Sequence, residues 1–201
     1  AVGLANIMDS SARADRAVVL SESVTWVGQS RIDRDQYNAI LRAPGVALTP
    51  EGEPAVTKGA RISVLRPGRS DGVPRAVVVR GYSPTVDVVR PEIRLVSGRL
   101  PGSGLDEMIV GRLAQSQFAG TDVGDEVTLV EGRRFRIVGV FESGDWVESG
   151  FVTDADTLLA VYGRQSTNAV IVQLTAEDSI GEFVAALNAE ATLREEDIDV
   201  V

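Results

Sequence analysis

The sequence predicts a domain of mixed α and β structure, because three observations agree. Short runs rich in Val and Ile are separated by clusters of Gly, Pro, Asp and Ser, as strands are separated by turns. Other segments carry apolar residues at helical spacing behind capping residues. The composition is that of a globular protein, with 44% hydrophobic residues among 201 and a net charge of −9. A chain of this length has room for one large domain or two small ones, with a real core.

Four segments are predicted to be helices: 33–46, 112–120, 153–163 and 179–190. Asp33 is the expected cap of the first, with Gln36 in the reciprocal capping-box position. Thr153 is the expected cap of the third. The last segment has the clearest pattern, because Ser179 and Glu182 are spaced as a capping box ahead of an apolar stripe. That stripe consists of Ile180, Phe183, Val184 and Leu187.

The remaining apolar runs are predicted to be strands, at 17–24, 60–67, 74–82, 92–99, 106–111 and 167–175. Within 125–141, apolar residues alternate on both sides of Glu131-Gly132. This alternation predicts a β-hairpin with its turn at that dipeptide.

The composition excludes several classes of function. The chain has no His and no Cys, so it lacks imidazole acid–base chemistry, thiol nucleophiles and the commonest ligands of zinc. Its acidic charge makes nucleic acid a poor partner, since such binding requires clustered Lys and Arg. Charge is uneven: 14 basic and 10 acidic side chains give residues 1–100 a net +4, whereas 6 and 19 give residues 101–201 a net −13. The acidic second half either forms a face that meets a basic partner or is simply solvated surface.

The first eight residues, "AVGLANIM", are mostly apolar. Either they form a buried first strand or helix, or they are the end of a transmembrane helix. No apolar run in the chain approaches the roughly 20 residues needed to span a bilayer, and no signal peptide is recognisable.

The stretch "VSGRLPGSGLDEMIVG", residues 96–111, resembles a phosphate-binding loop at first sight. However, no Lys-Ser or Lys-Thr follows its last glycine, and the loop precedes a strand where a phosphate loop should open a helix. A turn between two strands is therefore expected, with Gly102 and Gly104 in positive φ and Pro101 fixing the bend.

The stretch "FESGDWVESG", residues 141–150, gathers Glu142, Asp145 and Glu148 around Trp146. Paired carboxylates can serve as general acid and base, so a soluble carboxylate-based hydrolase is one hypothesis. A calcium loop is disfavoured, because the spacing of its ligands is missing. The other hypothesis is an exposed loop with an aromatic anchor that contacts a partner.

An ordered set of motifs resembles the extracytoplasmic domain of MacB-like ABC transporter permeases, of the wider FtsX/LolCDE type. No single motif is specific, but their order is. The set consists of "RGYSP" (80–84), "LVSGR" (95–99), "DEMIVGRLAQ" (106–115), "VGDEVTL" (123–129), "FRIVGVFES" (135–143) and "ESGFVTDADTLLAVYGR" (148–164). The resemblance covers residues 80–175 well and 17–66 loosely.

The resemblance implies an α+β fold with mixed sheets, in which a porter-like α/β unit carries a smaller inserted α/β unit. The first unit is expected at 17–80 and 166–201, the inserted one at 81–165, and the end of a transmembrane helix at 1–16. The implied location is the cell membrane, with this domain on the extracytoplasmic side.

The implied function is non-enzymatic, without a cofactor or metal. Such a domain couples ATP-driven movement of membrane helices to a periplasmic or extracellular partner or substrate. The implied partners are a cytoplasmic ATPase subunit or domain, a second permease copy or paralogue, and a periplasmic adaptor protein or lipoprotein. Trp146, with Glu142, Asp145 and Glu148, is the candidate contact.

Overall fold

A computed structural model describes residues 2–4, 15–21, 29–130 and 132–196. Its chain divides into two compact units. Unit 1 consists of Ala1–Lys58 and Gln165–Val201, and unit 2 of Gly59–Arg164. Each unit has its own apolar core. The expected α+β class with mixed sheets is confirmed. The sheet contains both parallel and antiparallel strand pairs, and helices lie between strands along the chain.

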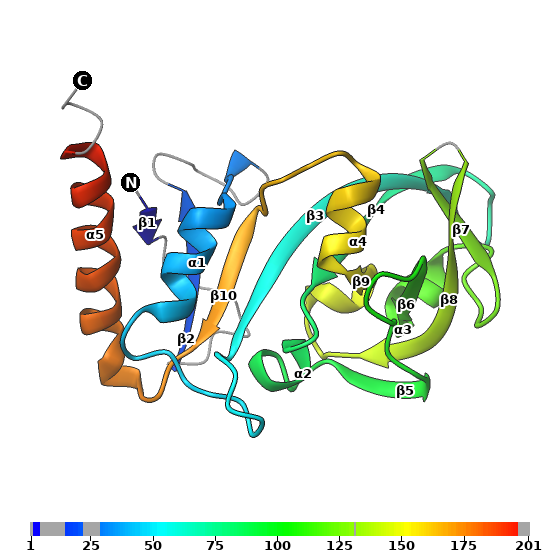
Figure 1. The fold of residues 1–201 in the computed structure, drawn as a ribbon. Coiled ribbons are helices and arrows are strands. Elements are labelled where there is room, and N and C mark those ends of the chain that lie inside the picture. The colour runs from blue at the N-terminus through cyan, green and yellow to red at the C-terminus, as the bar shows by residue number, and fades with distance from the viewer. Residues whose placement is uncertain (1, 5–14, 22–28, 131, 197–201) are drawn as a thin grey trace. The chain divides into compact units, whose positions relative to one another are not determined.

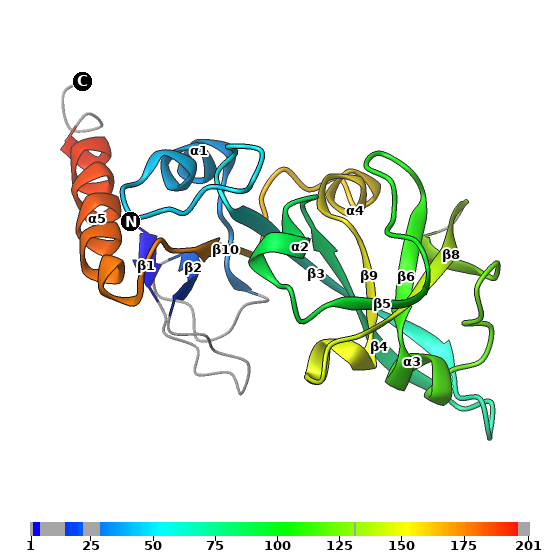
Figure 2. The same cartoon turned by 90° about the horizontal axis from the view of Figure 1, so that it is seen from below.

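Unit 1 is built on antiparallel strands. β2 (Arg16–Ser21) lies between β1 (Val2–Leu4) and β10 (Ala169–Gln173). β10 is followed in the sheet by β3 (Val56–Pro67), whose first three residues belong to this unit. The helices α1 (Arg34–Arg42) and α5 (Ile180–Glu196) complete the unit, with the short 3-10 helix η3 (Glu177–Ser179) before α5. Figures 1 and 2 show α1 across one face of β2 and β10.

The core of unit 1 joins both helices to the strands. Ile40 of α1 and Phe183 and Leu187 of α5 are buried in one cluster with Val19 and Val170 of the sheet. Of the stripe expected on the last helix, Phe183 and Leu187 therefore face the core, whereas Val184 is only partly buried. Ile180 packs against the same cluster while remaining partly exposed.

The capping box of α1 is confirmed. The Gln36 backbone N–H donates to the Asp33 carboxylate at 2.8 Å, and the Asp33 N–H donates to the Gln36 side chain at 3.0 Å. The helix ends at Arg42, just ahead of Pro44-Gly45, the pair expected to end it within the segment 33–46. Ala43 is extended because it precedes Pro44, and a residue before proline avoids helical geometry.

The expected end of a transmembrane helix at 1–16 falls mostly on residues 5–14, which lie outside the described residues. Where the structure does describe this segment, it shows strands instead. Val2–Leu4 pair antiparallel with Val19–Ser21, so their backbone groups bond to a neighbouring strand and not within a helix. Among the described residues, no helix is both long and apolar enough to cross a bilayer.

Unit 2 contains a mixed sheet. Its strands follow the order β3, β4 (Pro74–Tyr82), β9 (Phe151–Asp154), β6 (Glu107–Gly111), β8 (Arg133–Glu142) and β5 (Arg94–Gly98), and β7 (Glu126–Val130) pairs with β8. The predicted hairpin at 125–141 is confirmed as the β7–β8 pair, and Gly132 has φ +80° in its turn. Residue 131 lies outside the described residues.

Helices complete unit 2. α3 (Arg112–Gln117) follows β6, α4 (Ala155–Val161) follows β9, and α2 (Val86–Val89) is a single turn that the sequence analysis does not include. α4 packs on β4 and β9. Leu158 of α4, Met108 of β6 and three buried phenylalanines, Phe118, Phe135 and Phe151, belong to one core cluster.

The observed units differ from the expected division at their first boundary, which lies after Lys58 and not after Arg80. The reason is strand pairing. From Gly59 onward β3 forms a long hairpin with β4, and β4 pairs in parallel with β9 of the same unit. The hairpin therefore belongs to the unit that was expected to begin only at residue 81.

The cap of α4 also differs from the expectation. Asp154, and not Thr153, is the N-cap, and its carboxylate accepts from the Thr157 N–H at 2.9 Å. The Thr153 hydroxyl instead donates across the sheet to the carbonyl of Glu107 at 2.6 Å.

Candidate partner-contact site

The tryptophan loop, defined as residues 142–150, joins β8 to β9 in unit 2. It contains the 3-10 helix η2 (Trp146–Ser149), and Gly144 turns the chain ahead of it with φ +69°. At its end, the Gly111 N–H donates to the carbonyl of Gly150 at 2.9 Å. A side chain at Gly111 would meet the Glu148 carbonyl oxygen at 2.0 Å, so only glycine permits this close approach of strand and loop.

Asp145 is a buried structural carboxylate. Its Oδ2 accepts from Arg90 Nη2 at 2.5 Å, and the two side chains are only 5% and 6% exposed. Its Oδ1 accepts from the Ser143 hydroxyl at 2.6 Å and from the Val147 N–H at 3.0 Å, which caps η2. Every interaction of this side chain thus orders the tryptophan loop.

Arg90 is held by a second carboxylate as well. Its Nε donates to Glu92 Oε1 at 2.8 Å. Burial alone works against the charged guanidinium, but Tyr82, Glu92 and Asp145 together outweigh burial and raise the pKa of Arg90. Arg90 therefore stays charged and paired.

The other two acidic residues of the loop serve different partners. Glu148 Oε2 accepts from the backbone N–H groups of Ser143 and Gly144, both at 3.0 Å, and so closes the turn. Glu142 is partly exposed and accepts from Arg112 at 3.0 Å.

The three carboxylates therefore do not form a catalytic pair. Asp145 and Glu148 are each committed to hydrogen bonds that shape the loop. Glu142 belongs to a surface ion pair. The hydrolase hypothesis built on Glu142, Asp145 and Glu148 has no support from this arrangement, because a general acid or base needs a carboxyl group aimed at a substrate site. Among the described residues, no group of three His, Cys, Asp or Glu is placed to hold a metal ion.

Trp146 is the exposed member of the loop. Its side chain is 47% exposed, and its ring lies over Arg80 of β4, with 4.2 Å between the guanidinium carbon and the ring centroid. This is a cation–π contact of good geometry. The sequence pattern predicts Trp146 as part of the site, but it does not predict the arginine that lies beneath the ring.

Arg80 is the unusual residue of this site. It is 4% exposed, and within the part of the chain that the structure describes its Nε and Nη1 atoms have no hydrogen-bond partner. Burial lowers the pKa of Arg80 to about 10, and the nearby cations Arg61 and Arg90 act in the same direction, whereas Tyr82 and Asp145 oppose them. The group is still charged at neutral pH. Leaving buried donors unpaired costs about 1–3 kcal/mol.

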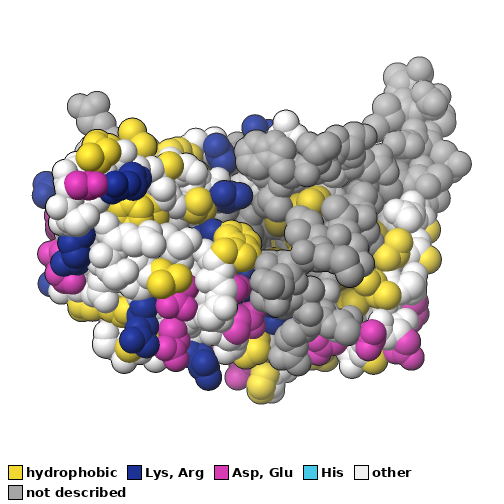
Figure 3. Space-filling model, turned by 180° about the vertical axis from the view of Figure 1, so that it is seen from behind, with side chains coloured by type: hydrophobic (Ala, Val, Ile, Leu, Met, Phe, Trp, Pro, Cys, Tyr) yellow, Lys and Arg dark blue, Asp and Glu magenta, His cyan; other side chains and the backbone are white. Residues whose placement is uncertain are grey.

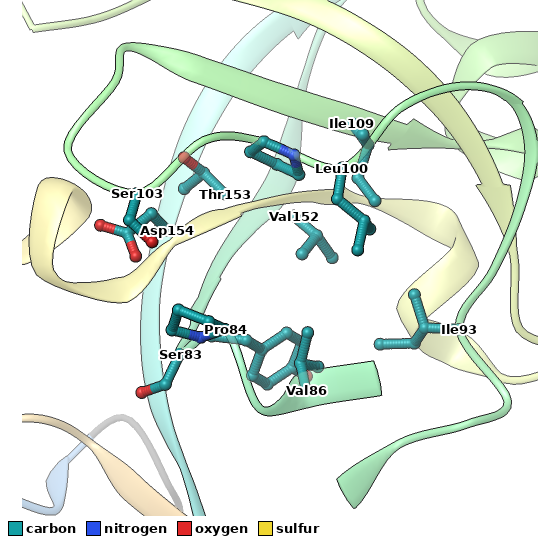
Figure 4. A pocket seen from close by; sticks show the side chains of 12 residues that line it. Ser83, Pro84, Val86, Ile93, Leu100, Ser103, Ile109, Val152, Thr153 and Asp154 are labelled. Atoms are coloured by element: carbon teal, nitrogen blue, oxygen red, sulfur yellow. The ribbon is translucent and has the colours of Figure 1, made fainter. Parts of the chain in front are cut away.

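Strand register places an apolar pocket on the same face of the sheet as Arg80. Arg80 is the register partner of Val152, which in turn pairs with Ile109, and both Val152 and Ile109 line the pocket. Figure 4 shows the lining side chains facing a common space. Its volume is about 120 Å³, below the several hundred cubic ångströms of a usual ligand pocket.

The polar side chains of this pocket do not form a reactive set. Asp154 is the α4 cap already described, and its Oδ2 also accepts from the Thr157 hydroxyl at 2.7 Å. Leu100, Pro101 and Ser103 of the β5–β6 loop also line the pocket, and Figure 4 shows Ser103 next to Asp154. The pocket is suited to a small apolar group and offers no catalytic pair.

The β5–β6 loop is a turn, as expected, and it is closed by an ion pair. Arg99 donates to Glu107 from both terminal nitrogens, at 2.7 and 2.5 Å, and the Gly102 N–H donates to the same carboxylate at 3.0 Å. An internal carboxylate thus takes up the donors that a phosphate would need. The positive φ values fall at Gly98 and Gly104, and not at Gly102. Gly98 is required because a side chain there would meet the backbone of Val138 at 2.2 Å.

The surface outside this site is mixed in character. Figure 3 shows Lys and Arg side chains lying next to Asp and Glu over the described part of one face, with apolar side chains scattered between them. Exposed ion pairs such as Arg134–Glu126 and Arg69–Asp122 are of this kind. Pairs like these contribute little to stability.

Comparisons with known proteins identify the family. The model of the MacB-like periplasmic core domain matches residues 3–190. The chain therefore belongs to the MacB-like periplasmic core domain family. Among curated proteins, none shows significant sequence similarity to the chain.

Two solved structures share the fold. The periplasmic region of MacB from Actinobacillus actinomycetemcomitans is 14% identical with a TM-score of 0.65, over 89% of this chain and 84% of that one. The extracellular domain of the noncanonical ABC-type transporter YknZ from Gram-positive bacteria is 20% identical with a TM-score of 0.60, over 81% and 85% of the two chains. Together with the family match, these similarities make the chain the extracytoplasmic domain of a MacB-like ABC transporter.

Proposed function

We propose that this domain is non-enzymatic and couples ATP-driven movement of membrane helices to an extracytoplasmic partner. The family match over residues 3–190 carries the proposal. The site supports it, because Asp145 and Glu148 are used to order a loop and not to face a substrate. The cytoplasmic ATPase and a second permease copy or paralogue are the proposed partners on the transporter side.

The proposed contact with the extracytoplasmic partner is the tryptophan loop. A buried ion pair fixes the loop from beneath, and the loop presents the half-exposed Trp146. Such a rigid, exposed aromatic side chain is a typical anchor of protein interfaces. An adaptor protein or a lipoprotein is the proposed class of partner, and the cell membrane, with this domain outside the cytoplasm, is the proposed location of the whole transporter.

Single cysteines test the contact, since the chain has no Cys of its own. Ser149→Cys places a thiol at an exposed position of the tryptophan loop, and Arg34→Cys places one at an exposed position of unit 1. In the intact transporter, a thiol-linked photocrosslinker at residue 149 is expected to capture the partner. Capture from residue 34 alone, with none from residue 149, would remove the tryptophan loop from the interface.

A further inference from the structure

The cation beneath Trp146 has hydrogen-bonding capacity that the described part of the chain does not use. Arg80 is almost fully buried, and its Nε and Nη1 atoms have no hydrogen-bond partner there. A buried charge is normally paired or hydrogen-bonded, because removal from water is costly. A buried guanidinium with two unpaired donors, in β4 beneath the ring of Trp146, therefore needs a reason.

The acidic residues around Arg80 are committed elsewhere. Asp145 attracts Arg80 electrostatically, but its two oxygens accept from Arg90, Ser143 and Val147. Glu92 also bonds to Arg90. Arg61 lies opposite Arg80 in the strand register and adds a second cation. No carboxylate in the described structure bonds to Arg80, so the positive charge at this position is in local excess.

Trp146 occupies only the face of the guanidinium. A ring stacked on a guanidinium contacts its π surface, whereas the N–H donors point outward in the guanidinium plane. The contact at 4.2 Å thus leaves those in-plane donors free for a further partner. Trp146 belongs to a four-residue 3-10 helix and its side chain is itself half exposed. Access to Arg80 requires this side chain to rotate while the backbone of the loop stays in place.

We propose that Arg80 and Trp146 form a recognition site for a carboxylate side chain of the extracytoplasmic partner. The aspartate or glutamate of the partner accepts from Nε or from Nη1 of Arg80, which lie on opposite edges of the guanidinium, and the apolar stem beside it packs on the Trp146 ring. The inference rests on the proposed function only in placing the partner at the tryptophan loop.

Charge selects a carboxylate over other anions. Arg80 and its neighbour Arg61 are few cations in a chain of net charge −9, so polyanions such as nucleic acids are repelled at long range. A phosphate dianion needs several convergent donors or cations, whereas Arg90 is already taken by Asp145 and Glu92. A single carboxylate of the partner is therefore suited to the guanidinium of Arg80, and the apolar group beside it is suited to the exposed indole of Trp146.

The test uses the isolated chain, ¹⁵N-labelled, and two small probes. N-acetyl-glutamate amide carries the carboxylate, and N-acetyl-glutamine amide is its neutral match. We expect saturable shifts of the Arg80 Nε–H and Trp146 indole N–H signals with the glutamate probe alone. Loss of the Trp146 indole shift in Arg80→Gln, and retention of both shifts in Arg75→Gln, would locate the site, because Arg75 is an exposed arginine paired with Asp71.

A second variant covers the case in which Arg80→Gln does not fold. Trp146→Ala removes an exposed side chain and is expected to weaken binding of the glutamate probe about tenfold, the value of one desolvated cation–π contact. Equal shifts with both probes, or none with either, would overturn the proposal. This result is independent of crosslinking: a positive titration without crosslinks from residue 149 contradicts the proposed interface and leaves the carboxylate site standing.

Discussion

Arg90 and Asp145, 55 residues apart in the sequence, form an ion pair at 2.5 Å in which both side chains are almost completely buried. The pair joins the residue after α2 to the N-cap of η2. The position of Trp146 next to this cap thus depends on a long-range contact. The tryptophan loop is rigid for the same reason that it is not catalytic: its central carboxylate is used to hold it.

Removal of the carboxylate is predicted to be costly. Asp145→Ala leaves Arg90 buried with one of its two acidic partners missing, so we expect the free energy of unfolding to fall by about 3–5 kcal/mol. The control is Glu126→Ala, which breaks the exposed pair with Arg134 and should cost less than about 1 kcal/mol. Urea denaturation measures both, and equal midpoints would mean that the buried pair does not order the loop.

The ion pair of Glu107 is predicted to make the free energy of unfolding depend on pH. The hydrogen bond from Arg99, helped by the Gly102 N–H, lowers the pKa of Glu107 to about 2. Because the folded pKa lies below the unfolded one, this stabilisation is present above about pH 4.5 and is lost as the pH falls towards 2.

The variant Glu107→Gln tests this dependence. We expect it to be less stable than the parent by about 1 kcal/mol at pH 7, a modest value because Arg99 is largely exposed. The difference should shrink between pH 5 and pH 2–3. Denaturation series of both proteins across this range measure it, and a constant difference would show that the ion pair is not its source.

Two glycine substitutions are predicted to have opposite effects. Gly111→Ala forces a methyl group against the Glu148 carbonyl, so it should destabilise by about 1–3 kcal/mol or more and shift the fluorescence of Trp146. Gly181→Ala in α5 meets nothing within 4 Å and should stabilise by about 0.5–1 kcal/mol. Thermal unfolding with emission spectra checks both, and an unchanged spectrum in Gly111→Ala would argue against the close approach.

The core of unit 1 is predicted to depend on Phe183. This side chain is fully buried among residues of α1 and the sheet, so Phe183→Ala should cost about 3–5 kcal/mol. Glu190→Ala, near the end of the same helix, should change stability by no more than about 0.5 kcal/mol. Similar losses in the two variants would contradict the packing of α5.

The sequence predicts well what depends on near neighbours. The capping box of Asp33 and Gln36 spans three residues and is found as expected. The apolar spacing of 179–190 likewise places Phe183 and Leu187 on the buried side. In both cases the determining interaction lies within one or two helical turns, so the local pattern contains it.

The errors arise where distant strands decide the outcome. Thr153 has the chemistry of a cap, but its hydroxyl bonds to the Glu107 carbonyl across the sheet. Gly98, and not Gly102, has positive φ, and a side chain at Gly98 would also meet the backbone of Val138 in another strand. The observed boundary between the units lies after Lys58 and not after Arg80 for the same reason. The pairing of β4 with β9 depends on two distant segments, and neither sequence alone predicts it.

The sequence predicts only some residues of the candidate site. Trp146 and its three acidic neighbours stand together in one short stretch, so a pattern search finds them. Arg80 and Arg90 come from distant segments. A signal for Arg80 exists, since it is a lone charge at the end of the apolar run "AVVV", and an isolated arginine in a central strand is a candidate for burial against a partner.

Coupling to ATP is the central claim, and crosslinking in different nucleotide states tests it most directly. The Ser149→Cys variant of the intact transporter, with a photocrosslinker on its thiol, is compared without nucleotide and during ATP hydrolysis, with Arg34→Cys as the reference position. The account predicts that the yield of the partner adduct from residue 149 changes between the two states. An equal yield in both states, from a transporter that hydrolyses ATP, would contradict it.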